Sequence, residues 1–392
     1  MEQAYLDNNA TAPLLPAVFE AMRPYFGERF GNPSSAHRRG REAHQAVEEA
    51  RERVAALLGA SPKEIVFTSG GSEGDTTAIL GLVSPGDHVI TSAIEHHAVL
   101  KSCKRLERAG TEVTYLAPDA SGRVNPAAVR AALRPATRLV SVMMANNETG
   151  VLQPVEEIGW IAAEAGAWFH TDAVQAAGKV PVDVARIGCA LLTISGHKLH
   201  GPPGVGAQYV RRGTFPRPLI YGGPQERGFR AGTENLPAIV GLGVAASLSV
   251  EWLASGAAAE MAAQRDRIER TVLDSIPQSR VNGAGAPRVP NTTSLLFPGI
   301  SAKALVLALD LDGISVSTGS ACSTESSEPP YVLRAMGLRP EDAYATIRCS
   351  LGKQTTSAEV GHFLRCLAGA VAHLRAISPS WTPGSAGKCP GA

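Results

Sequence analysis

Short apolar runs alternate with stretches of helical periodicity over roughly the first 255 residues of the chain. A short apolar run bounded by turn residues is typical of a buried strand, and helical stretches such as 97–109 and 155–165 separate most of these runs. The alternation predicts an α/β fold with a mostly parallel sheet that helices cover on both faces. The seven predicted strands are IVFT (65–68), HVIT (88–91), EVTYL (112–116), RLVSVMM (138–144), AWFHT (167–171), ALLTI (190–194) and GAQYV (206–210).

Two further helices are predicted in this part of the chain. Residues 38–58 carry apolar side chains at Ala43, Val47 and Val54, and Gly59 supplies a stop signal. The longest apolar stretch, LPAIVGLGVAASLSV at 236–250, is rich in small residues and too short to span a bilayer. We therefore expect a buried helix there and no membrane partner.

The pattern changes after about residue 255 and predicts a smaller α+β domain. We expect an N-terminal segment (1–15) that packs with this small domain, a large domain (16–257), the small domain (258–377) and a flexible tail (378–392) rich in Pro, Gly and Ser. The elements predicted in the small domain are helix 258–273, a loop at 282–293, strand 293–297, helix 302–310, helix 330–336, strand 346–350 and helix 357–375.

Composition and charge exclude several classes of protein. The 392 residues include 44% hydrophobic and 19% charged residues, with a net charge of +1, so nothing favours direct binding of nucleic acid. The N-terminus MEQAYLDNNATAP lacks the pattern of a secretory signal. Six scattered cysteines show neither a C-x-x-C pair nor metal-ligand spacing, so we expect no resident metal, no disulfide framework and a reducing cytoplasm.

One cysteine, Cys322, stands in a run of small and polar residues, ISVSTGSACSTESSEPP (314–330). A structural cysteine is usually surrounded by apolar residues, whereas this composition favours an exposed and mobile loop. A thiol in such a loop can react. Ordinary loops also carry cysteines, so the position alone leaves an incidental role open.

A lysine follows one of the predicted buried strands. Ser195, Gly196, His197 and Lys198 come directly after strand 190–194. Burial disfavours a charged amine, and one use for a desolvated lysine is a Schiff base with an aldehyde cofactor. A solvated lysine is the alternative for Lys198 alone, but Ser195 and His197 could hold a phosphate beside the imine.

Other polar groups also follow predicted strands. The turn TSGGSEGD (68–75) precedes a helix, whose first N–H groups could cradle an anion, although many such turns are rich in glycine. Asp172 could pair with a pyridine nitrogen or cap the next helix. His96 or His97 could move protons or stack on a ring, or be structural. The segment ANNETGV (145–151) adds polar residues after another strand.

Together these groups follow the carboxyl ends of successive strands, where α/β sheets bind ligands. A phosphate cradle, a partner for a ring nitrogen and a lysine nucleophile describe a site for pyridoxal phosphate.

The chain resembles the cysteine desulfurases of the NifS/IscS type, within the class V aminotransferase branch of the fold-type I pyridoxal phosphate enzymes. The resemblance runs from YLDNNAT near the N-terminus to IRCSLG (347–352). It includes GNPSSAH, FTSGGSE, EHHAVL, NNETGVLQP, HTDAVQAAGK, SGHKLHGPPG, RGFRAGTEN and STGSACS.

The resemblance implies a role for each matching residue. Lys198 would bind the cofactor as a Schiff base, Asp172 would pair with the pyridinium nitrogen, and His96 would stack on the ring and move protons. Gln175 and Asn147 would address the ring hydroxyl and the substrate side, and Arg348 would bind the substrate carboxylate. The phosphate would be held by Gly71, Ser72, Ser195 and His197, and by Thr233 from the other subunit of a homodimer.

The implied reaction converts L-cysteine to L-alanine. Cys322 would take the sulfur as a persulfide and deliver it to an acceptor, typically an iron–sulfur scaffold protein, so that Cys322 could contact a cluster transiently. Another class V enzyme, such as an aminotransferase or selenocysteine lyase, and a non-catalytic scaffold module are the alternatives. Glu325 and the tail depart from the family pattern, which leaves the acceptor open among nitrogenase maturation, general cluster assembly, tRNA thiolation and DNA sulfur modification.

Overall fold

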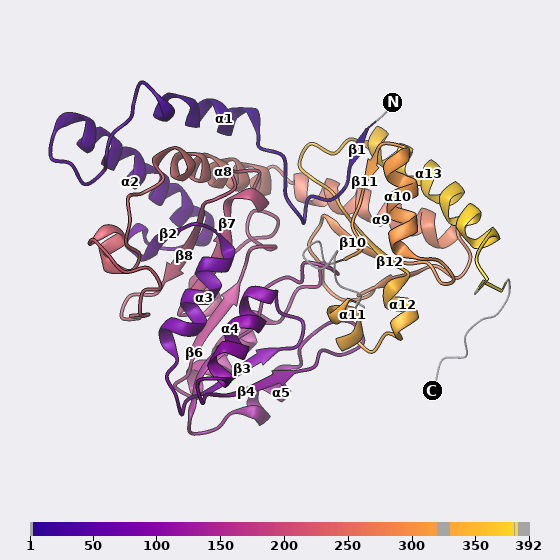
Figure 1. The fold of residues 1–392 in the computed structure, drawn as a ribbon, viewed down its shortest axis with the longest axis horizontal. Coiled ribbons are helices and arrows are strands. Elements are labelled where there is room, and N and C mark those ends of the chain that lie inside the picture. The colour runs from indigo at the N-terminus through magenta and orange to yellow at the C-terminus, as the bar shows by residue number, and fades with distance from the viewer. Residues whose placement is uncertain (1–2, 320–329, 380, 383–392) are drawn as a thin grey trace.

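The computed structural model describes residues 3–319, 330–379 and 381–382, and a seven-stranded sheet is its largest feature (Figure 1). Its strands are β2 (Ile65–Thr68), β3 (His88–Ser92), β4 (Glu112–Leu116), β5 (Thr137–Ser141), β6 (Trp168–Asp172), β7 (Leu191–Ser195) and β8 (Gly206–Val210). They lie in the order β2-β8-β7-β6-β5-β3-β4, and only β8 runs antiparallel to its neighbours. The prediction of a mostly parallel seven-stranded sheet is confirmed.

Both faces of this sheet are buried. The helices around it are α1 (Pro16–Met22), α2 (Arg38–Leu58), α3 (Gly71–Leu82), α4 (His97–Glu107), α5 (Pro126–Ala132), α6 (Val155–Glu164), α7 (Val184–Ile187) and α8 (Leu236–Ala254). Ile90 and Val140 belong to the core shared with α2, α6 and α8, whereas their neighbours Val89 and Leu139 belong to the core under α3 and α4. Successive strand residues point to opposite faces, so continuous apolar runs fill two cores at once.

The last third of the chain forms a smaller α+β unit, on the right in Figure 1. A three-stranded antiparallel sheet contains β9 (Arg280–Asn282), β10 (Thr292–Leu296) and β12 (Thr346–Ser350), with β10 in the middle. The helices are α9 (Ala257–Ser275), α10 (Ala302–Leu311), α11 (Tyr331–Ala335), α12 (Pro340–Tyr344) and α13 (Ser357–Ala376). Residues of α9, α10 and α13 share a separate apolar core with this sheet.

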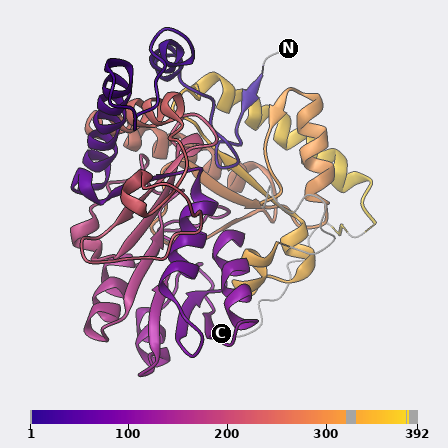
Figure 2. The same cartoon turned by 60° about the vertical axis from the view of Figure 1, so that its left-hand side comes forward.

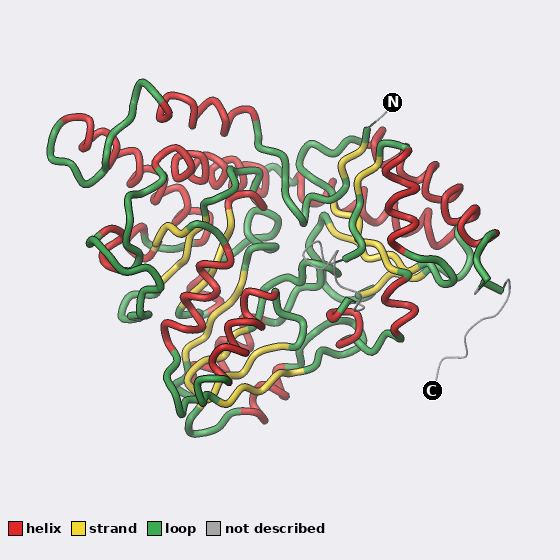
Figure 3. The backbone as a smooth tube through the Cα atoms, viewed as in Figure 1, coloured by secondary structure: helices red, strands yellow, loops and turns green. Residues whose placement is uncertain are grey.

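The N-terminal segment contacts both units. Strand β1 (Ala4–Tyr5) pairs in parallel with β11 (Ile314–Ser315), and Leu6 is buried in the core of the smaller unit. A few residues later, the N–H of Ala12 donates to the carbonyl of His197, just beyond β7. Figures 1 and 2 show this segment crossing to α1, and Figure 3 shows loops filling the region between the two sheets. The residues from Asp7 to Thr11 therefore lie where the two units meet.

The predicted element bounds agree with the structure to different degrees. Helix α2 has the predicted bounds. Strand β5 ends at Ser141, three residues before the predicted end, although the N–H groups of Val142 and Met144 still donate to carbonyls of His170 and Asp172. The elements absent from the prediction (α1, α7, α12, β1, β9 and β11) have two to seven residues, too few for a clear period.

Helix α8 corrects one argument from the sequence. It has 19 residues and is therefore longer than the apolar run 236–250. By length and composition it could cross a membrane, so the argument that this segment is too short to span a bilayer is wrong. More than half of its most apolar stretch is buried, and Ile239, Leu242 and Ala246 belong to the core that includes α2. The prediction of a buried helix is confirmed.

Candidate active site

A cavity of about 260 Å³ lies at the carboxyl ends of β2, β3, β5, β6 and β7. Each of these strands leads into a turn that contributes side chains to the cavity wall. Ten of the predicted site residues line it: Gly71, Ser72, His96, Asn147, Asp172, Gln175, Ser195, His197, Lys198 and Arg348. The structure thus brings together residues that are up to 277 positions apart, since the first is Gly71 and the last is Arg348.

Lys198 ends a short 3-10 turn, Gly196–Lys198, that directly follows β7. Its half-buried side chain reaches the N-terminal segment, where Nζ donates to the backbone oxygens of Asn9 at 2.5 Å and Ala10 at 2.6 Å. The amine therefore lies in the cavity at the meeting point of the two units.

The N-terminus of α3 forms an anion cradle. Gly70, with φ of 154°, turns the chain so that α3 begins at Gly71 without a side-chain cap, and the first N–H groups of a helix have no acceptor within it. The backbone is tightly packed here: a Cβ on Gly206 would lie 2.8 Å from the Gly70 Cα. Ser72, Ser195 and His197 line the same cavity. N–H groups, hydroxyls and an imidazole together suit a phosphate.

Asp172 is a buried carboxyl at the end of β6. Its Oδ1 accepts from the N–H of Val174 at 2.8 Å, and burial raises its pKa to about 6, against the effect of the positive Lys198. Asp75 of α3 also lines the cavity, and its Oδ1 accepts no hydrogen bond from the part of the chain that the structure describes. Burial and the charge of Asp172 raise the pKa of Asp75 well above its usual value. Two carboxyls held so close suit a cationic ring nitrogen.

His170, also on β6, lies beneath these carboxyls. Its Nε2 is 3.6 Å from Asp75 Oδ1, and burial lowers the pKa of His170 to about 3. The ring is therefore neutral and bonds to the hydroxyls of Ser141 and Thr193. It therefore offers no positive charge to Asp75, and the raised pKa of Asp75 favours the protonated form of that carboxyl.

His96 caps the N-terminus of α4. Its Nδ1 accepts from the N–H of Ala98 at 3.2 Å, which places the proton of the neutral ring on Nε2. Burial and the charge of Lys198 lower its pKa, so the neutral form prevails at neutral pH. The neighbouring ring of His97 packs against Tyr331, with centroids 4.8 Å apart, and Tyr331 closes one side of the cavity.

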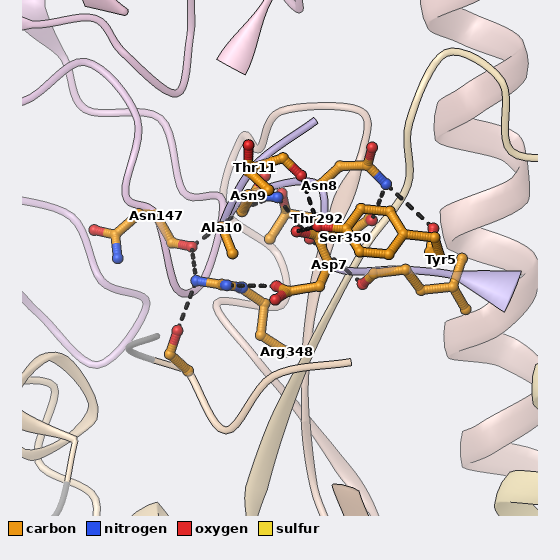
Figure 4. A network of polar contacts seen from close by, with 12 residues as sticks. Tyr5, Asp7, Asn8, Asn9, Ala10, Thr11, Asn147, Thr292, Arg348 and Ser350 are labelled. Carbon is orange, nitrogen blue, oxygen red and sulfur yellow. Dashed lines mark hydrogen bonds and ion pairs between the residues drawn. The ribbon is translucent and has the colours of Figure 1, made fainter. Parts of the chain in front are cut away.

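Arg348, on β12, is 2% exposed, and Figure 4 shows its contacts with Asp7 and Asn147. Its Nη2 forms a 2.7 Å ion pair with Asp7 Oδ1, and its Nη1 donates to the carbonyls of Asn147 at 3.0 Å and Gly319 at 2.6 Å. Its Nε is buried, and no group in the described ranges 3–319, 330–379 and 381–382 forms a hydrogen bond with it. The guanidinium is thus held by three groups and keeps one donor for a ligand carboxylate.

Several residues of the site were missed at the level of sequence. Asn9, Asp75 and Tyr331 line the cavity, and Asp7 binds Arg348. Asp7 and Asn9 lie in the motif YLDNNAT, next to the two-residue strand β1. The run of polar residues in this motif was the signal that could have pointed to them as site residues. Asp75 lies in the turn TSGGSEGD, where the glycine-rich composition indicated an anion cradle and not a carboxyl of the site.

Two predicted site residues do not line the cavity of the described chain. Thr233 is exposed, in the loop before α8. Cys322 lies outside the described residues, as does Glu325.

Comparisons with known proteins agree with this geometry. The family model for class-V aminotransferases matches residues 4–363. A cysteine desulfurase of Trichormus azollae is 49% identical over 382 residues, which cover 97% of this chain and 95% of that protein.

Solved structures are also similar. A NifS-like protein superposes with a TM-score of 0.88 at 37% identity, covering 95% of this chain and all of that one. The structure of SspA in complex with cysteine gives a TM-score of 0.79 at 38% identity, over 90% of this chain and all of that one. The chain belongs to the class-V aminotransferase family and, within it, to the cysteine desulfurases of the NifS/IscS type.

Proposed function

We propose that this protein is a pyridoxal phosphate-dependent cysteine desulfurase, which converts L-cysteine to L-alanine and passes the sulfur to an acceptor. The observation that carries the proposal is the single cavity that holds the Lys198 amine, the buried Asp172 carboxyl and the start of α3, in a chain of this family. The amine can react with the aldehyde of the cofactor, the carboxyl can pair with its pyridine nitrogen, and the N–H groups at the start of α3 can bind its phosphate.

The residues present fit pyridoxal phosphate. The raised pKa of Asp75 favours its protonated form, so the negative charge that would pair with a protonated ring nitrogen is that of the neighbouring Asp172. The tight glycine backbone at Gly70 and Gly71 lets a phosphate approach the N–H groups of α3. When bound, the cofactor supplies an electron sink for the bonds around the substrate α-carbon. Lys198, Asp172, His96, Gln175 and Asn147 would hold its ring, and Gly71, Ser72, Ser195 and His197 its phosphate.

Arg348 orients the substrate in this proposal. Its free Nε lies next to groups already fixed by Asp7 and by the carbonyls of Asn147 and Gly319, so it can donate to a carboxylate without reorganisation. His96 Nε2 carries a proton and faces the same cavity. It can therefore deliver or accept a proton at the substrate.

Cys322 would take the sulfur. Its thiolate attacks the substrate sulfur, an S–S bond forms as the substrate Cβ–S bond breaks, and the carbon gains a proton to become the methyl group of alanine. Gly319, three residues earlier, binds Arg348, and three residues span at most about 11 Å. The described chain therefore comes within reach of the cavity just before Cys322.

We also propose a homodimer. Thr233 is exposed, and nearby Arg230 forms a 3.0 Å ion pair with Glu73 in the first turn of α3, so this loop runs beside the anion cradle without completing it. Phe215 and Tyr221, 77% and 80% exposed, precede it. A second copy that covers these rings could place its Thr233 at the cradle. Light scattering of the loaded protein should give twice the mass of one chain, and a monomer that binds the cofactor fully would contradict the proposal.

The sulfur acceptor would be a scaffold protein of iron–sulfur cluster assembly, in the cytoplasm, with Cys322 in transient contact with the nascent cluster. The resemblance of the sequence to NifS/IscS enzymes supports this choice, and the other acceptors remain alternatives. Radiolabelled sulfur trapped on the protein should move to a co-purified scaffold, and its transfer only to a tRNA-modifying protein would contradict the choice.

Two variants test the function. Lys198→Ala should remove the visible absorbance of the bound cofactor and abolish formation of alanine. Cys322→Ser should keep that absorbance and lose sulfide and persulfide formation from cysteine. Undiminished turnover in Cys322→Ser would favour a class V aminotransferase or selenocysteine lyase, and a purified protein without a Lys198-dependent absorbance would favour a scaffold module.

A further inference from the structure

Lys179 is a buried lysine just behind the wall of the cavity. It is 9% exposed, and its Nζ lies 2.7 Å from Gln175 Oε1 and 3.1 Å from Asn9 Oδ1. Burial lowers its pKa well below the usual value, and the charged groups that act on it are all positive: Lys198, Arg348 and Lys353. Burying an amine among cations is unfavourable, so its two amide contacts need an explanation beyond packing.

The chemistry of a lysine makes these contacts directional. Lys179 Nζ is the donor in both contacts, and even a neutral amine has two N–H groups for these two amide oxygens, whereas an amide group offers an oxygen on one side and two N–H donors on the other. An amide that faces Lys179 must therefore turn its oxygen toward the amine. Without a donor at position 179, the two orientations of an amide that faces it would differ little in shape.

Gln175 shows the result at the cavity. With its oxygen facing Lys179, its Nε2 points the other way and donates to the backbone oxygen of Asn9 at 3.0 Å. That same oxygen accepts from Lys198 Nζ. Gln175 lines the cavity, so its second N–H is available to a ligand beside Lys198.

Asn9 is oriented in the same way. Its Oδ1 accepts from Lys179 and from Asn291 Nδ2 at 3.0 Å, and its Nδ2 donates to the carbonyl of Asn147 at 3.1 Å. Lys179 therefore also helps to fix the side-chain amide of Asn9, the residue whose backbone oxygen accepts from Gln175. Both contacts of the amine act on the same edge of the site.

We propose that Lys179 is a positioning residue that fixes the amide of Gln175, so that Gln175 presents an N–H donor, and not its oxygen, to the ring oxygen of bound pyridoxal phosphate. The inference rests on the proposed cofactor site and adds to it a residue that touches neither cofactor nor substrate. An N–H donor stabilises the anionic form of that ring oxygen, whereas an amide oxygen would repel it.

The test compares the loaded wild-type protein with Lys179→Met, which keeps the apolar stem and removes the donor. The visible absorbance of the bound cofactor is followed against pH. We expect its midpoint to rise by about one unit, and the dissociation constant of the cofactor to rise about tenfold, because one hydrogen bond to a charged group is lost. Lys179→Arg keeps a donor without an acceptor and should stay close to the wild type.

A double variant separates the orientation of the Gln175 amide from the simple loss of positive charge at position 179. In Gln175→Leu, Lys179→Met should add no further shift, because no amide is left to orient. A purely electrostatic effect of the amine would persist in that background. The other titratable groups that line the cavity are the same in every variant, so they do not contribute to the difference: Asp75, His96, His97, Asp172, His197, Lys198, Tyr331 and Arg348.

Lys353→Met is the matched control. Lys353 is also largely buried, with Nζ 2.8 Å from Ser249 Oγ, but it contacts no residue of the ring site, so the midpoint should stay unchanged. If Lys179→Met does not fold, Lys179→Leu replaces it, since a leucine also lacks a donor. No shift in either variant, or a shift that adds fully to that of Gln175→Leu, overturns the inference. Absorbance that survives Lys198→Ala would instead refute the proposed function.

Discussion

The two walls of the cavity differ in how completely their polar groups are hydrogen-bonded. The N-terminal wall is the segment from Asp7 to Ala10, of which Asn9 and Ala10 line the cavity, and Asn9 alone uses both its side-chain atoms and its carbonyl in contacts to other segments. The strand-end wall consists of Asp75, Asn147 and Asp172, and among the described residues nothing forms a hydrogen bond with the buried Asp75 Oδ1 or Asn147 Oδ1. Buried polar atoms are rarely left unpaired unless a ligand completes them. The hydrogen bonds of the N-terminal wall therefore stabilise the fold, whereas the unpaired polar atoms of the strand-end wall are available to a bound ligand.

This difference leads to opposite expectations for stability and for activity. Substitutions in the N-terminal wall should destabilise the fold, because hydrogen bonds within the protein are lost. Substitutions in the strand-end wall should act chiefly on the bound state, and some should stabilise the cofactor-free protein.

Asp172→Asn should have the largest effect on the strand-end wall. The charge of Asp172 can stabilise a protonated ring nitrogen and an asparagine cannot, so turnover should fall about 100- to 1,000-fold. A cysteine assay at saturating cofactor measures this loss.

The same substitution should stabilise the protein without cofactor. Burial raises the folded-state pKa of Asp172 to about 6, above its value in the unfolded chain, so its contribution to stability is lost as pH rises through that range. Asp172→Asn lacks this penalty and should be more stable at pH 8 by at most about 3 kcal/mol, with the advantage shrinking toward pH 5. Denaturant unfolding of both cofactor-free proteins checks this, and equal stability at pH 8 would contradict it.

Asp7→Asn should have the largest effect on the N-terminal wall. It removes the charge that pairs with the buried Arg348, and we expect the free energy of unfolding to fall by about 2–4 kcal/mol. Because the guanidinium is no longer held in place, the KM for cysteine should also rise about tenfold.

A matched pair that does not line the cavity separates these two effects. Arg51 and Glu226 form a buried ion pair with two contacts of 2.8 Å, which supports the large sheet. Glu226→Gln should destabilise the protein by a similar amount and leave the KM unchanged. If both variants change the KM equally, Asp7 has no particular role in positioning Arg348.

The same contrast explains what could be predicted from the sequence. The strand-end wall follows local patterns, since each group comes just after an apolar run, and the carboxyl ends of parallel strands meet. Lys198 and Asp172 were predicted on that basis. The N-terminal wall depends on contacts between positions such as Asp7 and Arg348, 341 residues apart, and no local period signals such a contact.

Other parts of the molecule follow the same rule. Helix α2 was predicted to its bounds because its apolar positions repeat over 21 residues, whereas the two-residue strand β1 exists only through its pairing with β11. Lys179, one turn after Gln175, resembles an ordinary surface lysine in the sequence, and only the fold shows that it is buried against two amides.

Asn147→Ala should have the smallest effect on stability, and it compares the two walls most directly. No hydrogen bond reaches the Asn147 side chain within the part of the chain that the structure describes, and its backbone oxygen, which binds Asn9 and Arg348, survives the substitution. The free energy of unfolding should change by less than about 1 kcal/mol, because the removed oxygen is an unsatisfied one.

Turnover of Asn147→Ala should nevertheless fall about tenfold, since the proposed contact to the cofactor or substrate is lost. Asn9→Ala is the counterpart on the N-terminal wall: its side chain makes four hydrogen bonds, and its loss should destabilise the protein by several times as much. Thermal unfolding of the two cofactor-free variants gives the comparison in one experiment. Equal losses of stability would mean that the unpaired oxygen of Asn147 is satisfied in solution and that the two walls do not differ in the way described.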